Sequence, residues 1–106
     1  MKRKKWCEFS KQERELIKKR DSCRCVFCGS PYNLQIAHIW VSRAHGGKGC
    51  KENGVILCTK CHQELDNYIG SRKNHDLIEA YCKKYLIKKE NLTIDNNFIK
   101  SIEYHK

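Results

Sequence analysis

The sequence predicts a small α+β domain, with two strands and a short helix at its centre and further helices before and after them. The strands come from two apolar patterns: residues 34–40 alternate in polarity, and residues 55–57 form a short apolar run. Two Cys-x2-Cys pairs flank these strands. Because each such turn presents two thiolates on one side, the pairs predict a four-cysteine zinc site that holds the domain together.

The length of 106 residues, without repeats or linkers, predicts a single domain over 1–106. We divide it into a basic N-terminal helical stretch at 1–22, a central stretch at 23–68 with both cysteine pairs, and a C-terminal helical packing segment at 69–106. A domain of this size buries a modest share of its surface, so a metal cross-link would add stability that the core alone lacks.

The chain is strongly basic, with 22 lysines and arginines against 12 acidic residues and a formal net charge of +10. This charge attracts polyanions, which favours nucleic acid as the partner over a merely solubilising surface. No apolar run approaches the roughly 20 residues of a membrane-spanning helix, and the basic N-terminus lacks the apolar core of a secretory signal. We therefore expect a cytoplasmic protein with no membrane partner; an anionic membrane surface is the weaker alternative.

Helix signals precede the predicted strands. Ser10 and Glu13 have the spacing of a capping box, which predicts a basic helix over about residues 10–20. The lysines and arginine of residues 2–5 predict a flexible basic arm. Residues 42–52, rich in glycine and positive charge, predict a loop between the strands.

Three helices are predicted after the second strand. Thr59 can cap the first, a second begins at Asn74 or His75, and a shorter third follows Asp95. The chain end from about Tyr104 is expected to fray. The side chains expected on the inner faces of the last two helices are Leu77, Ile78, Tyr81, Cys82, Tyr85, Leu86, Phe98, Ile99 and Ile102.

The four cysteines assigned to zinc are Cys25, Cys28, Cys58 and Cys61. In a reducing cytosol, closely spaced cysteine pairs are more often metal ligands than disulfides. Cys23 competes with Cys25 for the first position, and we prefer Cys25 because its two-residue gap to Cys28 repeats that of the second pair. The alternative interpretation is two pairs of buried or redox-active thiols.

Further motifs occur in a fixed order over about residues 25–66, and together they resemble the HNH endonucleases with zinc knuckles. Besides the two cysteine pairs, the matching elements are Ala37-His38-Ile39, Ser42-Arg43, Gly46-Gly47, Asn53-Gly54, Leu57-Cys58 and Cys61-His62. The resemblance implies a ββα-metal HNH finger, in which a hairpin and a helix hold one catalytic divalent ion. It also implies a bacterial or phage origin.

The resemblance gives three residues a role in phosphodiester hydrolysis. His38 is the expected general base that takes a proton from the attacking water, and imidazole suits this because its ordinary pKa lies near neutrality. Asn53 is expected to hold the His38 ring through a side-chain or backbone carbonyl. His62 is the expected ligand of a divalent metal, Mg²⁺ or Mn²⁺, which would stabilise negative charge on the scissile phosphate.

Ala37 departs from the family, which usually carries aspartate or histidine at this position as a further metal ligand. Asp66 offers a replacement, because it lies four residues after His62 on the predicted helix and so shares its face. The missing ligand also supports an alternative function: a zinc-dependent module that binds DNA or RNA with weak or no catalysis.

Nucleic-acid contacts are expected from the loop after the first strand. Arg43 matches the Ser-Arg pair of the family and is expected on a phosphate near the cut, while Lys48 and Lys51 can neutralise flanking phosphates. The implied partner is DNA, double-stranded rather than single-stranded. A phage packaging or recombination protein is a further candidate partner, and a bacterium or phage-infected host the expected setting.

Overall fold

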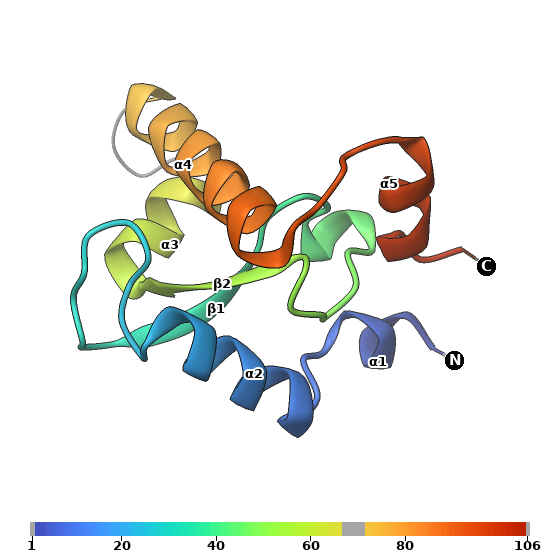
Figure 1. The fold of residues 1–106 in the computed structure, drawn as a ribbon, viewed down its shortest axis with the longest axis horizontal. Helices are drawn as coiled ribbons and strands as arrows, with labels where there is room; N and C mark the ends of the chain where they lie inside the picture. Colours follow the sequence, from blue (N-terminus) through green and yellow to red (C-terminus); the bar gives the residue numbers. More distant parts are fainter. Residues whose placement is uncertain (1, 67–71, 106) are drawn as a thin grey trace.

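The computed structural model describes residues 2–66 and 72–105. Two antiparallel strands form its centre, and helices surround them (Figure 1). None of the helices in this part of the chain is long and apolar enough to cross a membrane. In chain order the elements are α1 (Arg3–Cys7), α2 (Lys11–Asp21), β1 (Leu34–His38), the short 3-10 helix η1 (Arg43–His45), β2 (Gly54–Cys58), α3 (Thr59–Asp66), α4 (Arg72–Glu90) and α5 (Asn96–Ile102).

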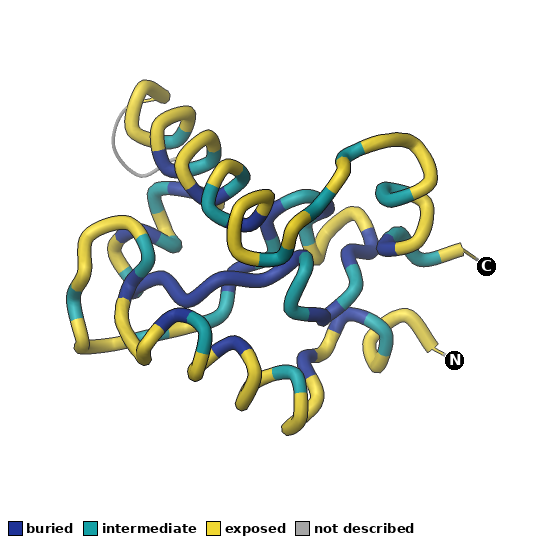
Figure 2. The backbone as a smooth tube through the Cα atoms, viewed as in Figure 1, coloured by how far each residue is buried: buried dark blue, intermediate teal, exposed yellow. Residues whose placement is uncertain are grey.

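The predicted α+β class, with a central hairpin and flanking helices, is confirmed. In the hairpin, Ile36 lies opposite Ile56 and His38 lies opposite Gly54. Helix α2 covers one face of the hairpin, and α3 with α4 covers the other (Figure 1). Strand β2 is therefore buried along its whole length, whereas β1 mixes buried and more exposed residues (Figure 2). This difference explains why the sequence of one strand is an apolar run and that of the other an alternation.

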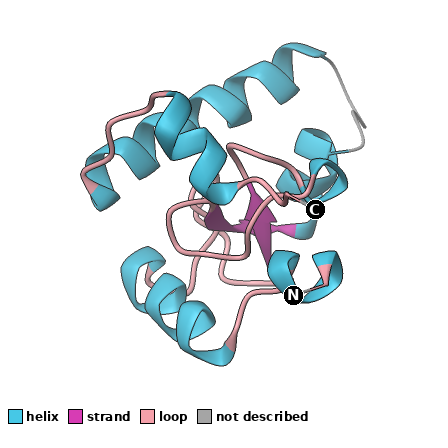
Figure 3. Ribbon diagram, turned by 90° about the vertical axis from the view of Figure 1, so that its right-hand side faces the viewer, coloured by secondary structure: helices cyan, strands magenta, loops and turns pink. Residues whose placement is uncertain are grey.

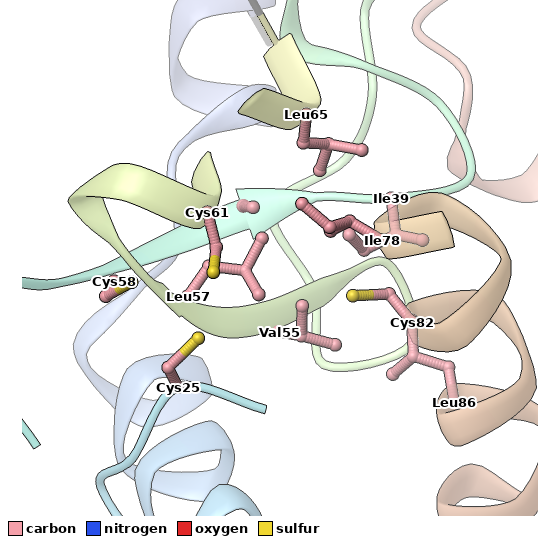
Figure 4. Packing of buried hydrophobic residues seen from close by; sticks show 11 residues of the cluster. Cys25, Ile39, Val55, Leu57, Cys58, Cys61, Leu65, Ile78, Cys82 and Leu86 are labelled. Atoms are coloured by element: carbon pink, nitrogen blue, oxygen red, sulfur yellow. The ribbon is translucent and has the colours of Figure 1, made fainter. Parts of the chain in front are cut away.

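The main core lies between the hairpin and the helix pair α3–α4. Val55 and Leu57 from β2 meet Ile78 and Leu86 from α4, and Leu65 from α3 closes one side (Figure 4). Full burial of one aliphatic side chain of this size contributes about 1.5–3 kcal/mol. This layer therefore fixes α4 on the hairpin although α4 follows it by many residues in the sequence.

Helices α2 and α5 begin at the capping residues that the sequence predicts. Ser10 Oγ accepts from the backbone N–H of Glu13 at 3.1 Å, and Asp95 Oδ1 accepts from the backbone N–H of Phe98 at 2.9 Å. These bonds satisfy donors that the start of a helix leaves without a partner. Helix α2 then packs on the hairpin through a small cluster of Phe9, Ile17 and Ile56.

A buried polar network ties α2, β2 and α4 together. Asp21 is 6% exposed, and its carboxylate accepts from Arg20, from the backbone N–H of Ile56 and from the hydroxyl of Tyr85. Arg20 also pairs with Glu90, at the end of α4, at 3.2 Å. A carboxylate that leaves water needs such partners, so the network sets how the three elements meet.

Both ends of the chain are fastened to the loop between the strands, which corrects two predictions. Residues 2–5 are not a flexible arm, because Arg3–Cys7 form helix α1 and the Trp6 Nε1–H donates to the Gly46 carbonyl at 3.0 Å. Tyr104 does not mark a frayed end, because its backbone N–H donates to the same carbonyl at 2.9 Å. The two termini accordingly lie on one side of the molecule (Figure 3).

Helix α4 presents a narrower inner face than the sequence predicts. Ile78, Cys82 and Leu86 are fully buried, but Leu77 is 51% exposed and Tyr81 is 49% exposed. A hairpin of two strands is narrow, so α4 contacts it along one line of residues spaced four apart. The neighbouring apolar positions therefore stay at the surface.

Candidate metal sites and catalytic cleft

The four predicted zinc ligands come together at one end of the hairpin. Cys25 and Cys28 precede β1, Cys58 ends β2, and Cys61 lies in the first turn of α3; in Figure 4 the sulfur atoms of Cys25 and Cys61 face each other. All four sulfur atoms lie within 4.8 Å of one another, and those of Cys28 and Cys58 are 3.6 Å apart. A tetrahedral zinc with bonds near 2.3 Å sets its sulfurs about 3.8 Å apart. The cluster therefore fits zinc, and Cys23 lies outside it.

The thiols of the cluster differ in how readily they ionise. Burial opposes ionisation of Cys25, but backbone hydrogen bonds, led by that of Cys28, outweigh it and lower the pKa of Cys25 to about 7. At Cys61, burial and the neighbouring thiols raise the pKa. Gly29 closes the turn of the first pair with φ +80°, a conformation that glycine adopts without strain. Four thiolates at this spacing repel one another, and a zinc ion would remove that repulsion.

His38, the last residue of β1, is half-buried against the N-terminal segment. Its Nε2 lies 2.9 Å from the carbonyl oxygen of Cys7, and its ring centroid lies 4.8 Å from that of Phe9. A carbonyl oxygen only accepts, so Nε2 carries the proton and Nδ1 keeps the lone pair that a base needs. Burial lowers the pKa of His38 and outweighs the opposing effect of the Cys7 carbonyl, and the charge of Arg43 lowers it further. The ring is therefore neutral near pH 7.

Asn53 is expected to hold the His38 ring through a side-chain or backbone carbonyl, and its side chain instead bonds to the loop after β1. Asn53 is fully buried, and its Oδ1 accepts from the backbone N–H groups of Trp40 at 2.7 Å and Val41 at 3.1 Å. Its Nδ2 donates to the carbonyls of Val41 at 3.0 Å and Lys48 at 3.1 Å. The side-chain amide is thereby saturated by the loop that follows β1. The Asn53 side chain shapes the backbone just after His38, and its backbone carbonyl accepts from the N–H of Ile39 at 2.8 Å.

His62 and Asp66 share one face of α3, as their spacing predicts. His62 Nε2 lies 2.7 Å from Asp66 Oδ2, and His62 Nδ1 lies 2.6 Å from Oε1 of Gln35 on β1. An oxygen thus faces each ring nitrogen. This suits either a protonated imidazolium or a metal held by Nε2 and the carboxylate while Nδ1–H donates to Gln35. The pair therefore offers two ligands to a divalent ion.

Among the residues that the structure describes, no third histidine, cysteine, aspartate or glutamate joins this pair. Within residues 2–66 and 72–105, only the four cysteines form a group of three or more histidine, cysteine, aspartate or glutamate side chains that is close enough to hold a metal. A site built on His62 and Asp66 would be completed by water and phosphate oxygens, which suits Mg²⁺ because that ion keeps several waters.

One cleft of about 570 Å³ joins the predicted base to Asp66, one of the two predicted metal ligands, whereas His62 is not among its lining residues. His38 and Asp66 line it together with Arg43, which is exposed on η1. The cleft thus brings together a neutral imidazole, a carboxylate and a guanidinium. Its remaining walls come from Ile39, Ser42, Ala44, His45 and Leu65 and, on α4, from His75 and Glu79.

The two lysines predicted to bind nucleic acid lie in different surroundings. Lys48 is half-exposed, and its ammonium lies 5.1 Å from the centre of the Trp6 ring. The ammonium of Lys51 pairs with Glu90 at 2.6 Å and with Glu52 at 3.0 Å, and these hydrogen bonds raise its pKa. Two carboxylates already compensate the charge of Lys51, which makes it a poor candidate for a phosphate contact.

Sequence reasoning missed several residues around the cleft. Cys7 reaches His38 through its backbone carbonyl, which leaves no signal in a side-chain pattern. His75 and Glu79 do carry a signal, since residues four apart share one face of a helix. His75 Nδ1 lies 2.7 Å from the Leu65 carbonyl, and its Nε2 lies 3.4 Å from Glu79. These contacts join the start of α4 to the end of α3.

The comparisons with known proteins agree with this geometry. Residues 25–67, under half of the chain, match the model of a family described as HNH endonuclease. A CRISPR-associated endonuclease Cas9 from Corynebacterium diphtheriae is 35% identical over 51 residues, which cover 45% of this chain and 5% of that protein. The solved structure of the type IV phosphorothioation-dependent restriction endonuclease ScoMcrA is similar with a TM-score of 0.56 and 23% identity, over 77% of this chain and 20% of that one.

The chain thus spans a small share of both relatives, and the likeness to ScoMcrA concerns the fold alone. The match to the family model covers both cysteine pairs and the three residues His38, Asn53 and His62. The similarity to the HNH endonuclease family thus lies in residues 25–67, the part of the chain that carries the candidate sites.

Proposed function

We propose that this chain is a metal-dependent endonuclease that hydrolyses phosphodiester bonds in DNA, with His38 as the general base. One observation carries the proposal. The Cys7 carbonyl holds Nε2 of His38, which leaves Nδ1 as the proton acceptor in a ring that lines the same cleft as Asp66 and Arg43. Because burial lowers the pKa of His38, the ring is in its basic form at neutral pH.

In the proposed reaction, Nδ1 of His38 takes a proton from a water molecule whose oxygen attacks the phosphorus. A bond forms between that oxygen and phosphorus, and the bond from phosphorus to the 3′ oxygen breaks. The charge of Asp66 favours the imidazolium that results, because it acts to raise the pKa of His38. Arg43, exposed at the cleft, can bind a phosphate oxygen and offset its negative charge.

His62 and Asp66 are the residues that would hold the divalent ion, Mg²⁺ or Mn²⁺, with Gln35 fixing the His62 ring. An ion bound there supplies positive charge to the phosphate and to the departing oxygen. A zinc ion held by the four cysteines would have a separate, structural role. It would join the turn before β1 to the start of α3, and so would set where His62 stands relative to the hairpin.

The net charge of +10 supports DNA as the substrate, and the Cas9 relative, described as an endonuclease, is in keeping with it. We take double-stranded DNA as the form bound, with Arg43 and Lys48 on the backbone. The bacterial or phage-infected cytoplasm as the setting, and a phage packaging or recombination protein as a partner, are proposals that rest on the family resemblance alone.

Ala37 favours a second candidate function. It is fully buried in the main core, where its methyl group packs and cannot bind a metal. A chain left with two protein ligands can bind its catalytic ion too weakly to cleave. The second candidate is therefore a zinc-dependent module that binds DNA or RNA without cutting it.

A plasmid-nicking assay separates the two candidates. Wild type and His38→Ala would be incubated with supercoiled DNA in Mg²⁺, in Mn²⁺ and in metal-free buffer. We expect nicking by the wild type only with metal, and a loss of at least about 100-fold in His38→Ala, because general-base catalysis contributes roughly 10²–10⁴-fold.

His105→Ala is the matched control, because His105 lies exposed near the chain end, with its Nε2 at 3.2 Å from the Lys100 carbonyl oxygen. It should nick like the wild type. Equal nicking by wild type and His38→Ala would refute the mechanism. DNA binding without nicking by any variant would favour the binding module.

A further inference from the structure

The segment formed by residues 3–9, which comprises α1 and the two residues after it, lies against the catalytic cleft although it is outside residues 25–67. The Arg3 guanidinium donates to the backbone carbonyls of Arg43 and Ala44 on η1. The Trp6 indole N–H donates to the Gly46 carbonyl at 3.0 Å, and the Trp6 backbone carbonyl accepts from the backbone N–H of Gly49 at 3.0 Å. The segment is thus fastened at several points to the loop that carries Arg43.

The same segment makes both close contacts to the His38 ring. The Cys7 carbonyl holds Nε2 at 2.9 Å, and the Phe9 ring lies against the imidazole at 4.8 Å between centroids, tilted by 47°. A hydrogen bond and a packed ring together fix the tautomer of a histidine and the direction in which its free nitrogen points. None of the loop and core contacts of Asn53 does this.

Gly49 permits this close approach. A Cβ atom built on Gly49 would lie 2.7 Å from the Cys7 carbonyl oxygen and would also strike the backbone of Glu8. The backbone of Gly49 has no positive φ, so an alanine there is strained only by this collision. A single methyl group at position 49 would therefore push the Cys7 carbonyl away from His38.

We propose that residues 3–9 are a positioning part of the catalytic site, in which the Cys7 carbonyl and the Phe9 ring orient His38 for proton abstraction. The inference rests on the proposed function and deepens it: the base is completed by a segment outside the HNH-family part of the chain. Within the segment, Cys7 and Phe9 contact His38, so we expect changes at these contacts to act on the rate of the chemical step rather than on DNA binding.

Two variants test the proposal, one for each contact of His38. Gly49→Ala displaces the Cys7 carbonyl, and Phe9→Leu removes the aromatic ring while keeping an apolar side chain. Ile17→Val is the matched control, because Ile17 belongs to the same small core cluster as Phe9 but is not among the contacts of His38. Zinc content and circular dichroism would confirm that each variant is folded.

Two readouts are compared. In nicking kinetics, Gly49→Ala and Phe9→Leu should each lower kcat about tenfold with KM unchanged within about twofold, since small misplacement of a catalytic group costs this much or more. In NMR spectra, the His38 Nε2–H should give a protected signal in the wild type and in Ile17→Val. That signal should be lost to solvent exchange in the other two variants.

Retention of this signal by folded Gly49→Ala and Phe9→Leu would overturn the positioning role. So would equal loss of kcat in Ile17→Val and in the two test variants. The NMR measurement does not depend on cleavage, so it tests the positioning role even if the wild type does not nick DNA. Failure of the wild type to nick DNA would refute the proposed endonuclease function and leave the positioning role standing.

Discussion

At His38, burial sets the charge of the imidazole ring and a hydrogen bond sets its tautomer. Burial disfavours the charged form, which keeps the imidazole basic and unprotonated near pH 7. The hydrogen bond from Nε2 to the Cys7 carbonyl decides which nitrogen is the acceptor. A strand residue that was exposed and unbonded would have neither property, so the half-buried position is itself part of the proposed chemistry.

The pH dependence of cleavage follows from the direction of this pKa shift. The neutral ring is the active form, and a pKa below the ordinary 6.5 means that it persists into mild acid. We expect kcat/KM for nicking to be level around neutrality and to fall with a midpoint below 6.5, measured from about pH 5 to about pH 8.

A midpoint above 6.5 would contradict this assignment of the base. Raising the metal concentration tenfold separates loss of metal from protonation of the base, because only the former shifts with metal. In Arg43→Gln the midpoint should rise, since the charge of Arg43 acts to lower the pKa of His38.

Asn53 makes a different kind of contribution, to stability. Its fully buried amide forms four hydrogen bonds with the loop after β1. Asn53→Ala would leave buried N–H and carbonyl groups without partners, and we expect the free energy of unfolding to fall by about 3 kcal/mol.

Urea unfolding followed by circular dichroism measures this loss. Asn97→Ala, at an exposed position on α5, is the control and should change the free energy of unfolding by under about 0.5 kcal/mol. A urea midpoint for Asn53→Ala equal to that of the wild type would show that the loop does not depend on this side chain.

At the scale of elements, local sequence signals predicted most of the secondary structure. Helix α2 begins after Ser10 and α5 begins after Asp95, and each of these side chains accepts a backbone N–H of the first turn. Helix α1 could not be predicted in this way, because its one buried residue, Cys7, and its anchor, Trp6, act through contacts to residues some forty positions away.

In the candidate site, too, the contacts between residues close in sequence were predictable and those between distant residues were not. His62 and Asp66 lie four apart on one helix, so local spacing alone predicts their contact, which is observed at 2.7 Å. The partners of Asn53 and His38 depend on how the loop and the N-terminal segment fold back. Such long-range backbone contacts have no periodicity in the sequence, which therefore did not show that the Asn53 side-chain amide bonds to the loop after β1.

The four clustered cysteines come from the turn before β1, from β2 and from α3, so a zinc ion bound there would link these elements and its loss should be severe. Cys58→Ser should unfold the chain, because structural zinc contributes about 10–16 kcal/mol in small domains and a whole domain is stable by only about 5–15 kcal/mol. Circular dichroism and zinc content per chain, before and after treatment with a strong chelator, measure the effect.

Cys23→Ser is the matched control, since Cys23 is exposed and lies outside the cluster. It should keep one zinc per chain and unfold like the wild type. A folded Cys58→Ser protein without zinc would refute the structural role, and loss of zinc in Cys23→Ser would restore Cys23 as a ligand.

Across the whole molecule, the net charge of +10 is not equally available to DNA. Arg20 pairs with Asp21 and Glu90 inside the fold, and Lys51 pairs with Glu52 and Glu90. These cations stabilise the packing of α2 and α4 around the hairpin. A count of basic residues therefore overstates the charge at the surface, and position decides which of them can meet a phosphate.

The salt dependence of DNA binding tests this division. Each phosphate that a cation neutralises contributes about 0.9 to the slope of log K against log salt. Arg43→Gln should therefore lower the magnitude of the slope by about 1. Lys51→Gln should leave the slope unchanged, because the Lys51 ammonium is already held at 2.6 Å and 3.0 Å by two carboxylates. Fluorescence anisotropy with a DNA duplex, in a His38→Ala background that prevents cleavage, would measure both. An equal loss of slope in the two variants would mean that Lys51 leaves Glu52 and Glu90 to bind a phosphate. Breaking those ion pairs costs free energy, so the wild type would then bind DNA less tightly than its charge alone predicts.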